Sequence, residues 1–433
     1  METLARKFKD KTARIVVVGA GYVGLPLAVE AARAGLETIA FDVDEQKVRA
    51  VNAGTSYVGD VPDTDLKPLV ESGKLRAAAD PVVMAGADAV IICVPTPLNK
   101  TKDPDVSMIM SAAGALLPHL HRDQLVVLES TTYPGFTREV LKPALERTGL
   151  KVGRDVFLAF SPERVDPGNP RFQTRNTPKV IGGMTDACQK LTVALYSHFI
   201  EKIVPVTSCD SAEMVKILEN TFRAVNIGLV NEVALMCKKL GINTWEVIDA
   251  ASTKPFGFMP FYPGPGLGGH CIPVDPHYLS WKLRTLKYNA RFIELAGVIN
   301  SGMPEVVTQL VADAMNDRMK TVNGSKILVL GVAYKPDIED VRESPSLDVI
   351  ELLAARGGQV SYHDPYVPKL VEGHLTMESV PFDALGSYDC VVIVTHHKCI
   401  DYLKLCKEAQ LVVDTRNATK GLRSDFAEKI VTL

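Results

Sequence analysis

The sequence has few of the features that mark membrane, secreted or nucleic-acid-binding proteins. None of its apolar runs approaches the roughly 18 residues that a membrane-spanning helix needs, and residues 1–11 lack the apolar core of a secretory signal. The 48 basic and 51 acidic residues leave a formal net charge of -3, so no basic surface for nucleic acid is indicated. The eight cysteines stand singly, without the paired spacing of a disulfide framework or a zinc site. We therefore expect a cytoplasmic protein with no nucleic-acid partner, no membrane partner and no metal ion.

Short apolar runs rich in β-branched residues recur at both ends of the chain, separated by segments long enough for helices. Continuous apolar strands that alternate with helices are typical of a parallel sheet covered on both faces. In the N-terminal part the expected strands are residues 14–18, 38–42, 89–95, 125–131 and 157–163. In the C-terminal part they are residues 326–331, 359–365, 390–395 and 410–417.

The middle of the chain differs, because helical stretches replace the strands. From Ser211 the sequence runs without proline to residue 240, which predicts one long connector helix. A second helical region, residues 290–319, contains Gly302 and Pro304, and we expect it to be interrupted there. The sequence thus predicts an α/β protein in which a helical central domain joins two Rossmann-like, doubly wound parallel-sheet domains. The expected domains are residues 1–207, 208–322 and 323–433.

A glycine-rich turn follows the first expected strand and opens the first expected helix. Its glycines, Gly19, Gly21 and Gly24, have the spacing that lets backbone approach a pyrophosphate at a helix N-terminus. Asp42 ends the next strand, 18 residues after Gly24, where a carboxylate accepts hydrogen bonds from ribose hydroxyls. Because this charge would repel a 2′-phosphate, the predicted cofactor is NAD and not NADP. Asp44 is an alternative ribose ligand, and a nucleotide-free α/β domain is the alternative interpretation of the turn.

The most informative stretch is PGPGLGGHCIPVDP, residues 263–276, whose glycines and prolines exclude a regular helix or strand. It leads into a helix expected to start near Pro273, so Cys271 is predicted to lie close to a helix N-terminus, where the dipole favours the nucleophilic thiolate. Asp275 is expected on the same side, within reach of a water beside the sulfur. His270 is interpreted as structural or substrate-lining. Five other cysteines are interpreted as small buried hydrophobic residues: Cys93, Cys188, Cys209, Cys237 and Cys390.

Further candidates lie on the connector helix and at strand ends. Lys216 and Asn220 are four residues apart and share one helix face, and an ammonium beside an amide suits an oxygen that gains negative charge. The alternative is a solvated polar pair on an amphipathic helix. Ser130, Thr131 and Glu163 end their expected strands at the edge where open parallel sheets bind ligands, although polar strand ends also cap helices.

Several motifs together resemble the UDP-glucose/GDP-mannose dehydrogenase family. They span nearly the whole chain, in order: GAGYVG, VPTP, ESTTYPG, FSPER, AEMVKILEN, PGPGLGGHCIPVDP and GVAYKPDIEDVRESP. The resemblance implies an NAD-binding N-terminal domain, a helical central domain used in dimerisation, and a C-terminal domain that holds the nucleotide of a UDP-sugar. It also implies the reaction, in which the C6 primary alcohol of the sugar becomes a carboxylate while two NAD are reduced. The expected assembly is a homodimer or a higher homo-oligomer.

The resemblance also implies roles for the residues at matching positions. The matched catalytic positions are Cys271 as nucleophile, Lys216 and Asn220 as the oxyanion-stabilising pair, Asp275 as base near the sulfur, and Thr131 and Glu163 as the residues that handle water. The matched cofactor positions are Gly19, Gly21, Tyr22, Val23, Gly24, Asp42, Pro95, Thr96, Ser130 and Thr131. The matched substrate positions are Glu163, Arg164, Lys216, Asn220, Gly268, Lys335 and Arg342.

Departures from the family pattern bear on the sugar. Val274 stands where members acting on UDP-glucose or GDP-mannose typically carry lysine, and Pro273 stands where members acting on UDP-N-acetylmannosamine usually carry alanine. The stretch therefore most resembles the branch that acts on UDP-N-acetylhexosamines, and within it the members acting on UDP-N-acetylglucosamine. UDP-N-acetylmannosamine and UDP-glucose are the alternative substrates. A two-electron hydroxy-acid dehydrogenase and a catalytically silent nucleotide-sugar sensor are more distant alternatives.

Two C-terminal motifs are interpreted as binding neither a cofactor nor a metal. The GVAYK turn lacks Gly-x-Gly-x-x-Gly, so no second dinucleotide site is expected there. The sequence HHKC, residues 396–399, matches no ordinary zinc pattern and is interpreted as structural.

Overall fold

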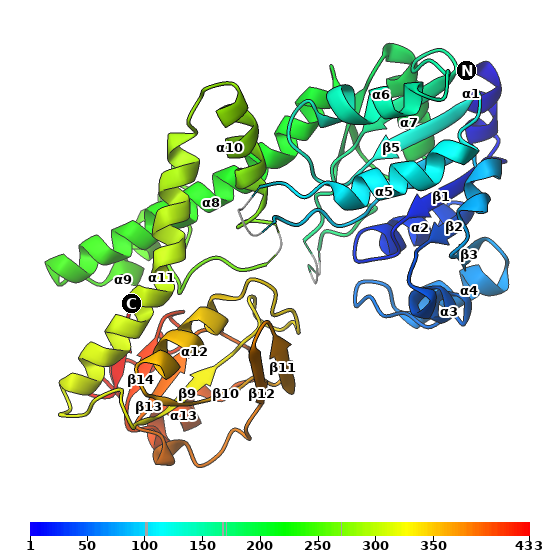
Figure 1. Ribbon diagram of the computed structural model, residues 1–433. Helices are drawn as coiled ribbons and strands as arrows, with labels where there is room; N and C mark the ends of the chain where they lie inside the picture. The colour runs from blue at the N-terminus through cyan, green and yellow to red at the C-terminus, as the bar shows by residue number, and fades with distance from the viewer. Residues whose placement is uncertain (100–102, 167–168, 170, 270) are drawn as a thin grey trace. The chain divides into compact units, whose positions relative to one another are not determined.

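The computed structural model describes residues 1–99, 103–166, 169, 171–269 and 271–433 (Figure 1). The chain forms two compact units. The first consists of residues 1–219 and 277–287, and the second consists of residues 220–276 and 288–433.

The first unit is built on an eight-stranded sheet, whose strands are blue to green in Figure 1. All neighbouring strands run parallel except β6 and β7, which are antiparallel. The expected strands are all present. Three further strands were not predicted, and they extend the sheet at both edges, β3 at one edge and β7 with β8 at the other. In spatial order the strands are β3 (Leu75–Ala78), β2 (Glu37–Phe41), β1 (Arg14–Val18), β4 (Ala89–Ile92), β5 (Gln124–Leu128), β6 (Val156–Phe160), β7 (Lys179–Gly183) and β8 (Ile203–Val206).

Both faces of this sheet are buried, as the continuous apolar strands predict. One set of alternating strand residues, including Ile15 and Val127, shares a core with helices that include α1 (Glu2–Lys9), α2 (Gly24–Arg33) and α7 (Asp186–Tyr196). Residues of the opposite face, such as Val16 and Leu128, are also fully buried. The other helices of this part are α3 (Glu45–Asn52), α4 (Asp63–Glu71), α5 (Ser107–Leu116) and α6 (Lys142–Glu146).

The second unit contains a five-stranded, wholly parallel sheet and a separate antiparallel hairpin, which Figure 1 shows in yellow to red. In spatial order the strands of the sheet are β10 (Gln359–His363), β9 (Lys326–Leu330), β13 (Cys390–Ile393), β14 (Val412–Asp414) and β15 (Ile430–Thr432). The hairpin is β11 (Lys369–Glu372) with β12 (Leu375–Glu378), and the accompanying helices are α12 (Pro345–Ala355) and α13 (Tyr402–Glu408). The predicted fold class, two Rossmann-like sheets with helices between them in the sequence, is confirmed.

The helical middle of the chain contains the predicted connector helix, α8 (Cys209–Leu240), which is 32 residues long. The other helices are α9 (Thr244–Ser252), α10 (Asp275–Thr285) and α11 (Arg291–Asn316). The predicted interruption at Gly302 and Pro304 is wrong, because α11 is continuous through both residues. Residues from Met303 onward are buried in the core that α11 shares with β9 and β13. This packing outweighs the local cost of a proline inside a helix.

Candidate active site

The glycine-rich turn joins β1 to α2, as the sequence predicts. Gly19 has a φ of +96°, and a Cβ there would lie 2.6 Å from the Cys93 carbonyl oxygen. A Cβ on Gly24 would lie 1.8 Å from the Gly19 oxygen, so the turn closes on its own backbone. A Cβ on Gly21, by contrast, would meet no atom of the described residues within 4 Å. The middle of the turn is therefore open, which fits a pyrophosphate lying against backbone at the start of α2.

Asp42 follows β2 and faces this turn. Its carboxylate accepts hydrogen bonds from the Ala20 and Asp44 N–H groups, each at 2.9 Å, and lies 3.4 Å from the Lys47 ammonium. The Asp44 carboxylate instead caps helix α3. The acid beside the turn is thus Asp42, at the position where a ribose is held in this type of domain.

Polar contacts fix the neighbouring strand ends. The Ser130 hydroxyl donates to the Val94 carbonyl at 2.8 Å and joins the ends of β5 and β4. The Tyr278 hydroxyl, from α10, donates to the Thr96 carbonyl at 3.0 Å. Because β1, β4 and β5 are parallel neighbours, their carboxyl ends meet at one edge. The predicted cofactor residues that belong to this edge, besides the glycines and Asp42, are Tyr22, Val23, Pro95, Thr96, Ser130 and Thr131.

A buried lysine holds Glu163 just after β6. The Lys179 ammonium, at the start of β7, lies 2.8 Å from one Glu163 oxygen and 2.7 Å from a Glu129 oxygen. The Tyr196 hydroxyl donates to the other Glu129 oxygen at 2.5 Å. The second Glu163 oxygen accepts from the backbone N–H groups of the next two residues, at 2.6 and 2.7 Å. The Lys179 and Glu129 side chains are 3% and 0% exposed, so these residues form a closed ion-pair network at the edge of the sheet.

Burial and charge act in opposite directions on this network. Burial raises the pKa of the Glu163 carboxyl, but the Lys179 ammonium and the two backbone N–H groups together outweigh burial and hold that pKa below its usual range. For Glu129, burial outweighs the same ammonium, and the pKa is raised. Burial lowers the pKa of Lys179, but the two carboxylates more than offset it, so the net shift is upward. The network therefore keeps Glu163 anionic at the strand end.

Helix α8 carries Lys216 and Asn220, one turn apart. The Lys216 side chain is half-buried, and its ammonium has no hydrogen bond or ion pair within the described part of the chain. Arg164 contacts the same helix, since its Nη2 and Nε donate to the Glu219 carboxylate at 2.5 and 3.2 Å. Its Nη1 donates to the Pro178 carbonyl at 2.6 Å. The predicted substrate residue Arg164 thus uses two nitrogens to tie the loop after β6 to α8, and a third to contact the residue before β7.

Cys271 lies at the start of a turn that leads into α10. Its carbonyl oxygen accepts from the Val274 and Asp275 N–H groups, at 3.1 and 2.8 Å, and its side chain is half-buried. The second of these bonds joins residues four apart, as in a helix, although α10 itself begins at Asp275 and not at Pro273. The cysteine therefore lies at a helix N-terminus, while His270 lies outside the described residues.

Asn220 and Asp275 meet beside this turn. The Asn220 Nδ2 donates to the Asp275 Oδ2 at 2.5 Å, and the two residues are 7% and 3% exposed. Because a carboxylate only accepts hydrogen bonds, this contact fixes the orientation of the amide. One Nδ2 hydrogen serves Asp275, and the other can be donated to a substrate oxygen. The structure thus brings together Cys271, Asn220 and Asp275, which lie far apart in the sequence.

The other cysteines differ from Cys271 as predicted. Burial raises the pKa of the Cys93, Cys209 and Cys390 thiols well above their usual range, which keeps them protonated and unreactive. The five cysteines interpreted as buried hydrophobic residues are all buried: Cys93, Cys188, Cys209, Cys237 and Cys390.

The predicted substrate residues Lys335 and Arg342 belong to one loop that follows β9. Lys335 is half-buried, and Arg342 donates from Nε and Nη2 to the Asp340 carboxylate at 2.9 and 2.6 Å. The Arg342 carbonyl accepts from the Gly269 N–H at 3.0 Å. A Cβ on Gly268 would lie 2.5 Å from a side-chain carbon of the same loop. The two glycines before Cys271 therefore let the loop with Lys335 pack directly against the cysteine turn.

Comparisons with known proteins agree with this geometry. The UDP-glucose/GDP-mannose dehydrogenase family matches the chain through its NAD binding domain at residues 13–200, its central domain at 210–302 and its UDP binding domain at 328–421. A UDP-N-acetyl-D-mannosamine dehydrogenase from Yersinia pestis is 37% identical over 93% of this chain and 98% of that protein. The chain belongs to the UDP-glucose/GDP-mannose dehydrogenase family.

Solved structures of the family share the fold along the whole chain. The UDP-D-ManNAc dehydrogenase from Pyrococcus horikoshii superposes with a TM-score of 0.86 at 33% identity, covering 94% of this chain and 96% of that one. An NDP-N-acetyl-D-galactosaminuronic acid dehydrogenase from Methanosarcina mazei gives a TM-score of 0.83 at 29% identity, covering 100% and 97%. Family membership confirms the prediction of an NAD-dependent nucleotide-sugar dehydrogenase, and the UDP binding domain indicates a UDP-sugar substrate.

Two cations of this dehydrogenase were missed by sequence analysis. Lys179 was missed because β7 was not predicted. Arg416 lies two residues after the end of β14, where burial lowers its pKa to about 10 and its Nε donates to the Val394 carbonyl at 2.8 Å. A Cβ on Gly264 would lie 2.4 Å from the guanidinium, which places this cation against the loop before Cys271. The position of Arg416 could have marked it as a candidate binding residue, because it stands at the end of an expected strand, where open parallel sheets bind ligands.

Among the residues that the structure describes, no helix combines the length and the apolar character that crossing a bilayer requires. Nor do they contain a cluster of three or more His, Cys, Asp or Glu side chains that could hold a metal ion.

Proposed function

We propose that the protein oxidises the C6 hydroxyl of a UDP-N-acetylhexosamine to a carboxylate, with UDP-N-acetylglucosamine as the substrate. The observation that carries this proposal is the Asn220–Asp275 hydrogen bond beside the Cys271 turn. A nucleophile at a helix start, with an amide donor and a carboxylate next to it, suits covalent capture of an aldehyde. A two-electron hydroxy-acid dehydrogenase would not need such a group.

The proposed sequence of steps assigns each residue one task. A water held by Asp275 takes the proton of the C6 hydroxyl, and the Lys216 ammonium stabilises the negative charge that develops on the oxygen, as C6 loses a hydride and the alcohol becomes an aldehyde. The Cys271 thiolate then adds to the aldehyde carbon, and the resulting alkoxide takes up a proton to give a thiohemiacetal. NAD, when bound, accepts one hydride in each of the two oxidations. The second oxidation removes a hydride from C6, and the proton of the thiohemiacetal hydroxyl passes to the water held by Asp275, which gives a thioester. No free aldehyde is released, because the sugar stays bound to the sulfur.

Hydrolysis completes the reaction. Water adds to the thioester carbon and loses a proton to Asp275 or Glu163, and the carbon–sulfur bond then breaks. The Cys271 thiolate is regenerated, and the product is the carboxylate. Lys216 and the remaining Asn220 hydrogen would stabilise the tetrahedral oxyanion. The anionic form of Glu163, held by Lys179, supports a role in accepting the proton.

The choice of sugar rests on the turn after Cys271. Val274 is apolar and only 8% exposed, at the position where members acting on UDP-glucose typically carry a long cation. An acetamido group is larger and less polar than a hydroxyl, so an apolar residue there favours the N-acetylhexosamine. Pro273 favours UDP-N-acetylglucosamine within that branch. UDP-N-acetylmannosamine is the second candidate, because the relatives from Yersinia pestis and Pyrococcus horikoshii are named for it.

A panel of UDP-sugars tests this proposal. We expect two NADH for each sugar consumed, and kcat/KM for UDP-N-acetylglucosamine at least about tenfold above that for UDP-glucose. NADP should replace NAD poorly, because Asp42 repels a 2′-phosphate. One NADH per sugar would contradict the four-electron reaction, and no NADH despite tight UDP binding would indicate a sensor. A higher kcat/KM for UDP-N-acetylmannosamine would contradict the choice of epimer alone.

We infer, in addition, that the protein is a homodimer that pairs through α8 and α11. These helices contact each other, since a Cβ on Gly228 would lie 3.1 Å from Ala296. Both helices also expose large apolar side chains, and such a face is typical of an interface between subunits. The exposed residues are Phe222, Leu229, Met236, Phe292, Leu295 and Val298.

Charge placed on this face should separate the subunits. The variant L229E/V298E is expected to sediment as a monomer where the wild type sediments as a dimer, because two carboxylates would be buried without partners. Sedimentation velocity measures this difference, and the exposed substitution K190E serves as a control. A monomeric wild type, or a double variant that remains dimeric, would exclude this interface.

A further inference from the structure

The C-terminal sheet repeats one detail of the NAD-binding sheet. In the first sheet, Asp42 follows the strand beside β1 and accepts from the Ala20 N–H in the glycine turn. In the second sheet, Asp364 follows β10 and accepts from the Val332 and Ala333 N–H groups after β9, at 2.8 and 3.0 Å. Asp364 therefore takes the place that Asp42 has in the NAD-binding domain.

The Asp364 carboxylate, however, is enclosed by groups of its own chain. Asp364 is 1% exposed, and its other oxygen accepts from the Tyr366 and Val367 N–H groups at 2.8 and 3.2 Å. Burial raises its pKa, but the His397 hydrogen bond and the backbone N–H groups more than offset this and lower the pKa to about 2. Because its lone pairs accept hydrogen bonds from its own chain, Asp364 has no capacity left for ribose hydroxyls. Its carboxylate must therefore have a role other than ribose binding.

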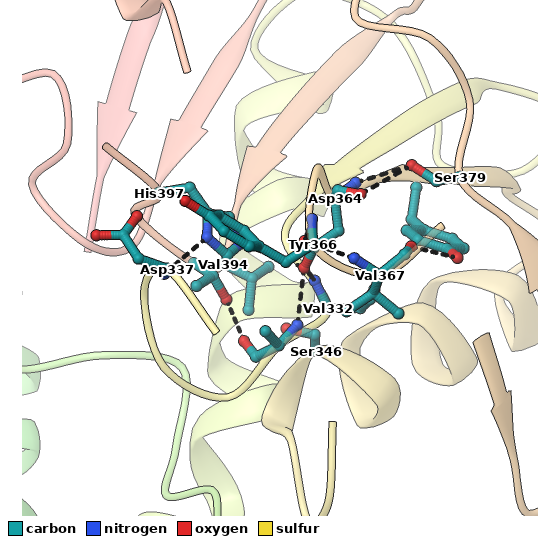
Figure 2. A network of polar contacts seen from close by, with 12 residues as sticks. Val332, Asp337, Ser346, Asp364, Tyr366, Val367, Ser379, Val394 and His397 are labelled. Atoms are coloured by element: carbon teal, nitrogen blue, oxygen red, sulfur yellow. Dashed lines mark hydrogen bonds and ion pairs between the residues drawn. The ribbon is translucent and has the colours of Figure 1, made fainter. Parts of the chain in front are cut away.

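His397 completes the enclosure and has a defined tautomer. Its Nδ1 lies 3.0 Å from the Asp337 backbone nitrogen, and its Nε2 lies 3.2 Å from the Asp364 carboxylate (Figure 2). A backbone N–H can only donate, so Nδ1 must accept and carries no hydrogen. Nε2 then carries the hydrogen and donates it to Asp364. His397 is 1% exposed, and the Tyr366 ring lies over it at a centroid distance of 5.1 Å.

These contacts hold the loop that carries Lys335. The Thr395 hydroxyl donates to the Ala333 carbonyl at 2.6 Å, and the Asp337 carboxylate accepts from the Lys398 N–H at 2.9 Å. The backbone is thus fixed two residues before Lys335 and two residues after it. The far end of the same loop packs against the glycines that precede the cysteine turn.

We propose that His397 is a positioning residue for UDP-sugar binding: through Asp364 and the Asp337 N–H it fixes the loop so that Lys335 faces the diphosphate. This inference rests on the proposed function and on the substrate-binding roles that the family resemblance implies for Lys335 and Arg342. The acid that would bind ribose in a dinucleotide site is used here to anchor a substrate loop.

The substitution His397→Phe keeps the ring and removes both hydrogen bonds. We expect the Kd for UDP, measured by titration calorimetry on the full-length protein, to rise about tenfold, with the Kd for NAD unchanged. The KM for the UDP-sugar should rise by a similar factor, while kcat at saturating sugar is retained. His396→Phe, an exposed neighbour, is the matched control. An unchanged UDP Kd in folded His397→Phe would overturn the proposal.

Lys335→Ala separates this inference from the proposed function. If Lys335→Ala weakens UDP binding and His397→Phe does not, the positioning role fails while the nucleotide site stands. If Lys335→Ala leaves UDP binding unchanged, the proposed role of the loop fails instead.

Nitrogen NMR of wild-type protein labelled at histidine avoids any effect of substitution on folding. The signal of His397 should show a protonated Nε2 and an unprotonated Nδ1 at pH 8. A proton on Nδ1 would contradict the hydrogen bonds on which the proposal depends.

Discussion

Replacement of Cys271 by serine is expected to reduce carboxylate formation by at least about a thousandfold. A serine hydroxyl at this position remains protonated and adds poorly to an aldehyde, so the second oxidation lacks its covalent intermediate. The first oxidation does not need the sulfur and should still proceed. We therefore expect Cys271→Ser to release at most one NADH per active site before turnover stops.

Rapid mixing followed by NADH absorbance measures this arrest. Cys399→Ser, which alters an exposed cysteine of the C-terminal domain, is the control and should turn over like the wild type. Steady carboxylate production by Cys271→Ser, with two NADH per sugar, would refute the assignment of the nucleophile.

Replacement of Lys179 by methionine is expected to lower the free energy of unfolding by about 3–5 kcal/mol at neutral pH. The variant leaves the Glu129 and Glu163 carboxylates buried without the cation that pairs with both. In the wild type Glu163 has a lowered pKa, so its contribution to stability is present above the ordinary carboxyl pKa and is lost as pH falls. Without Lys179, burial raises the pKa of Glu163, and the variant should gain stability as pH falls and protonates it.

The difference in stability between wild type and Lys179→Met should therefore be largest near neutral pH and smaller near pH 4–5. Urea unfolding across this range measures it. Lys190→Met, which removes an exposed lysine of α7, is the matched control, and the added substitution Glu129→Gln should restore part of the loss. A loss below about 1 kcal/mol at pH 7 would show that the network contributes little to stability.

Strong local signals explain what the sequence predicted well. The glycine turn, Asp42 and the Cys271 loop depend on short spacings, because a turn can close on its own backbone only with glycine at a few positions. The continuous apolar strands predicted both sheets for a similar reason, since each strand is buried on two faces. The same reasoning placed Cys271 at a helix N-terminus to within two residues.

Long-range packing explains what the sequence did not predict. The continuity of α11 through Pro304 depends on the core beneath it, which local propensity does not contain. Lys179 meets Glu129 across 50 residues of sequence, and no local pattern marks that pair. Strand β7, which runs antiparallel to β6, was also not predicted. The direction of a strand depends on the strands that it pairs with, and the local sequence does not contain that information.

The proposed mechanism depends on one covalent intermediate, in which Cys271 carries the sugar between the two oxidations. Enzyme quenched in acid during turnover, digested and analysed by mass spectrometry, tests this claim directly. The peptide that contains Cys271 should carry the mass of the oxidised UDP-sugar as a thioester, and no other cysteine peptide should do so. Unmodified Cys271 throughout turnover, with two NADH still formed per sugar, would contradict this mechanism.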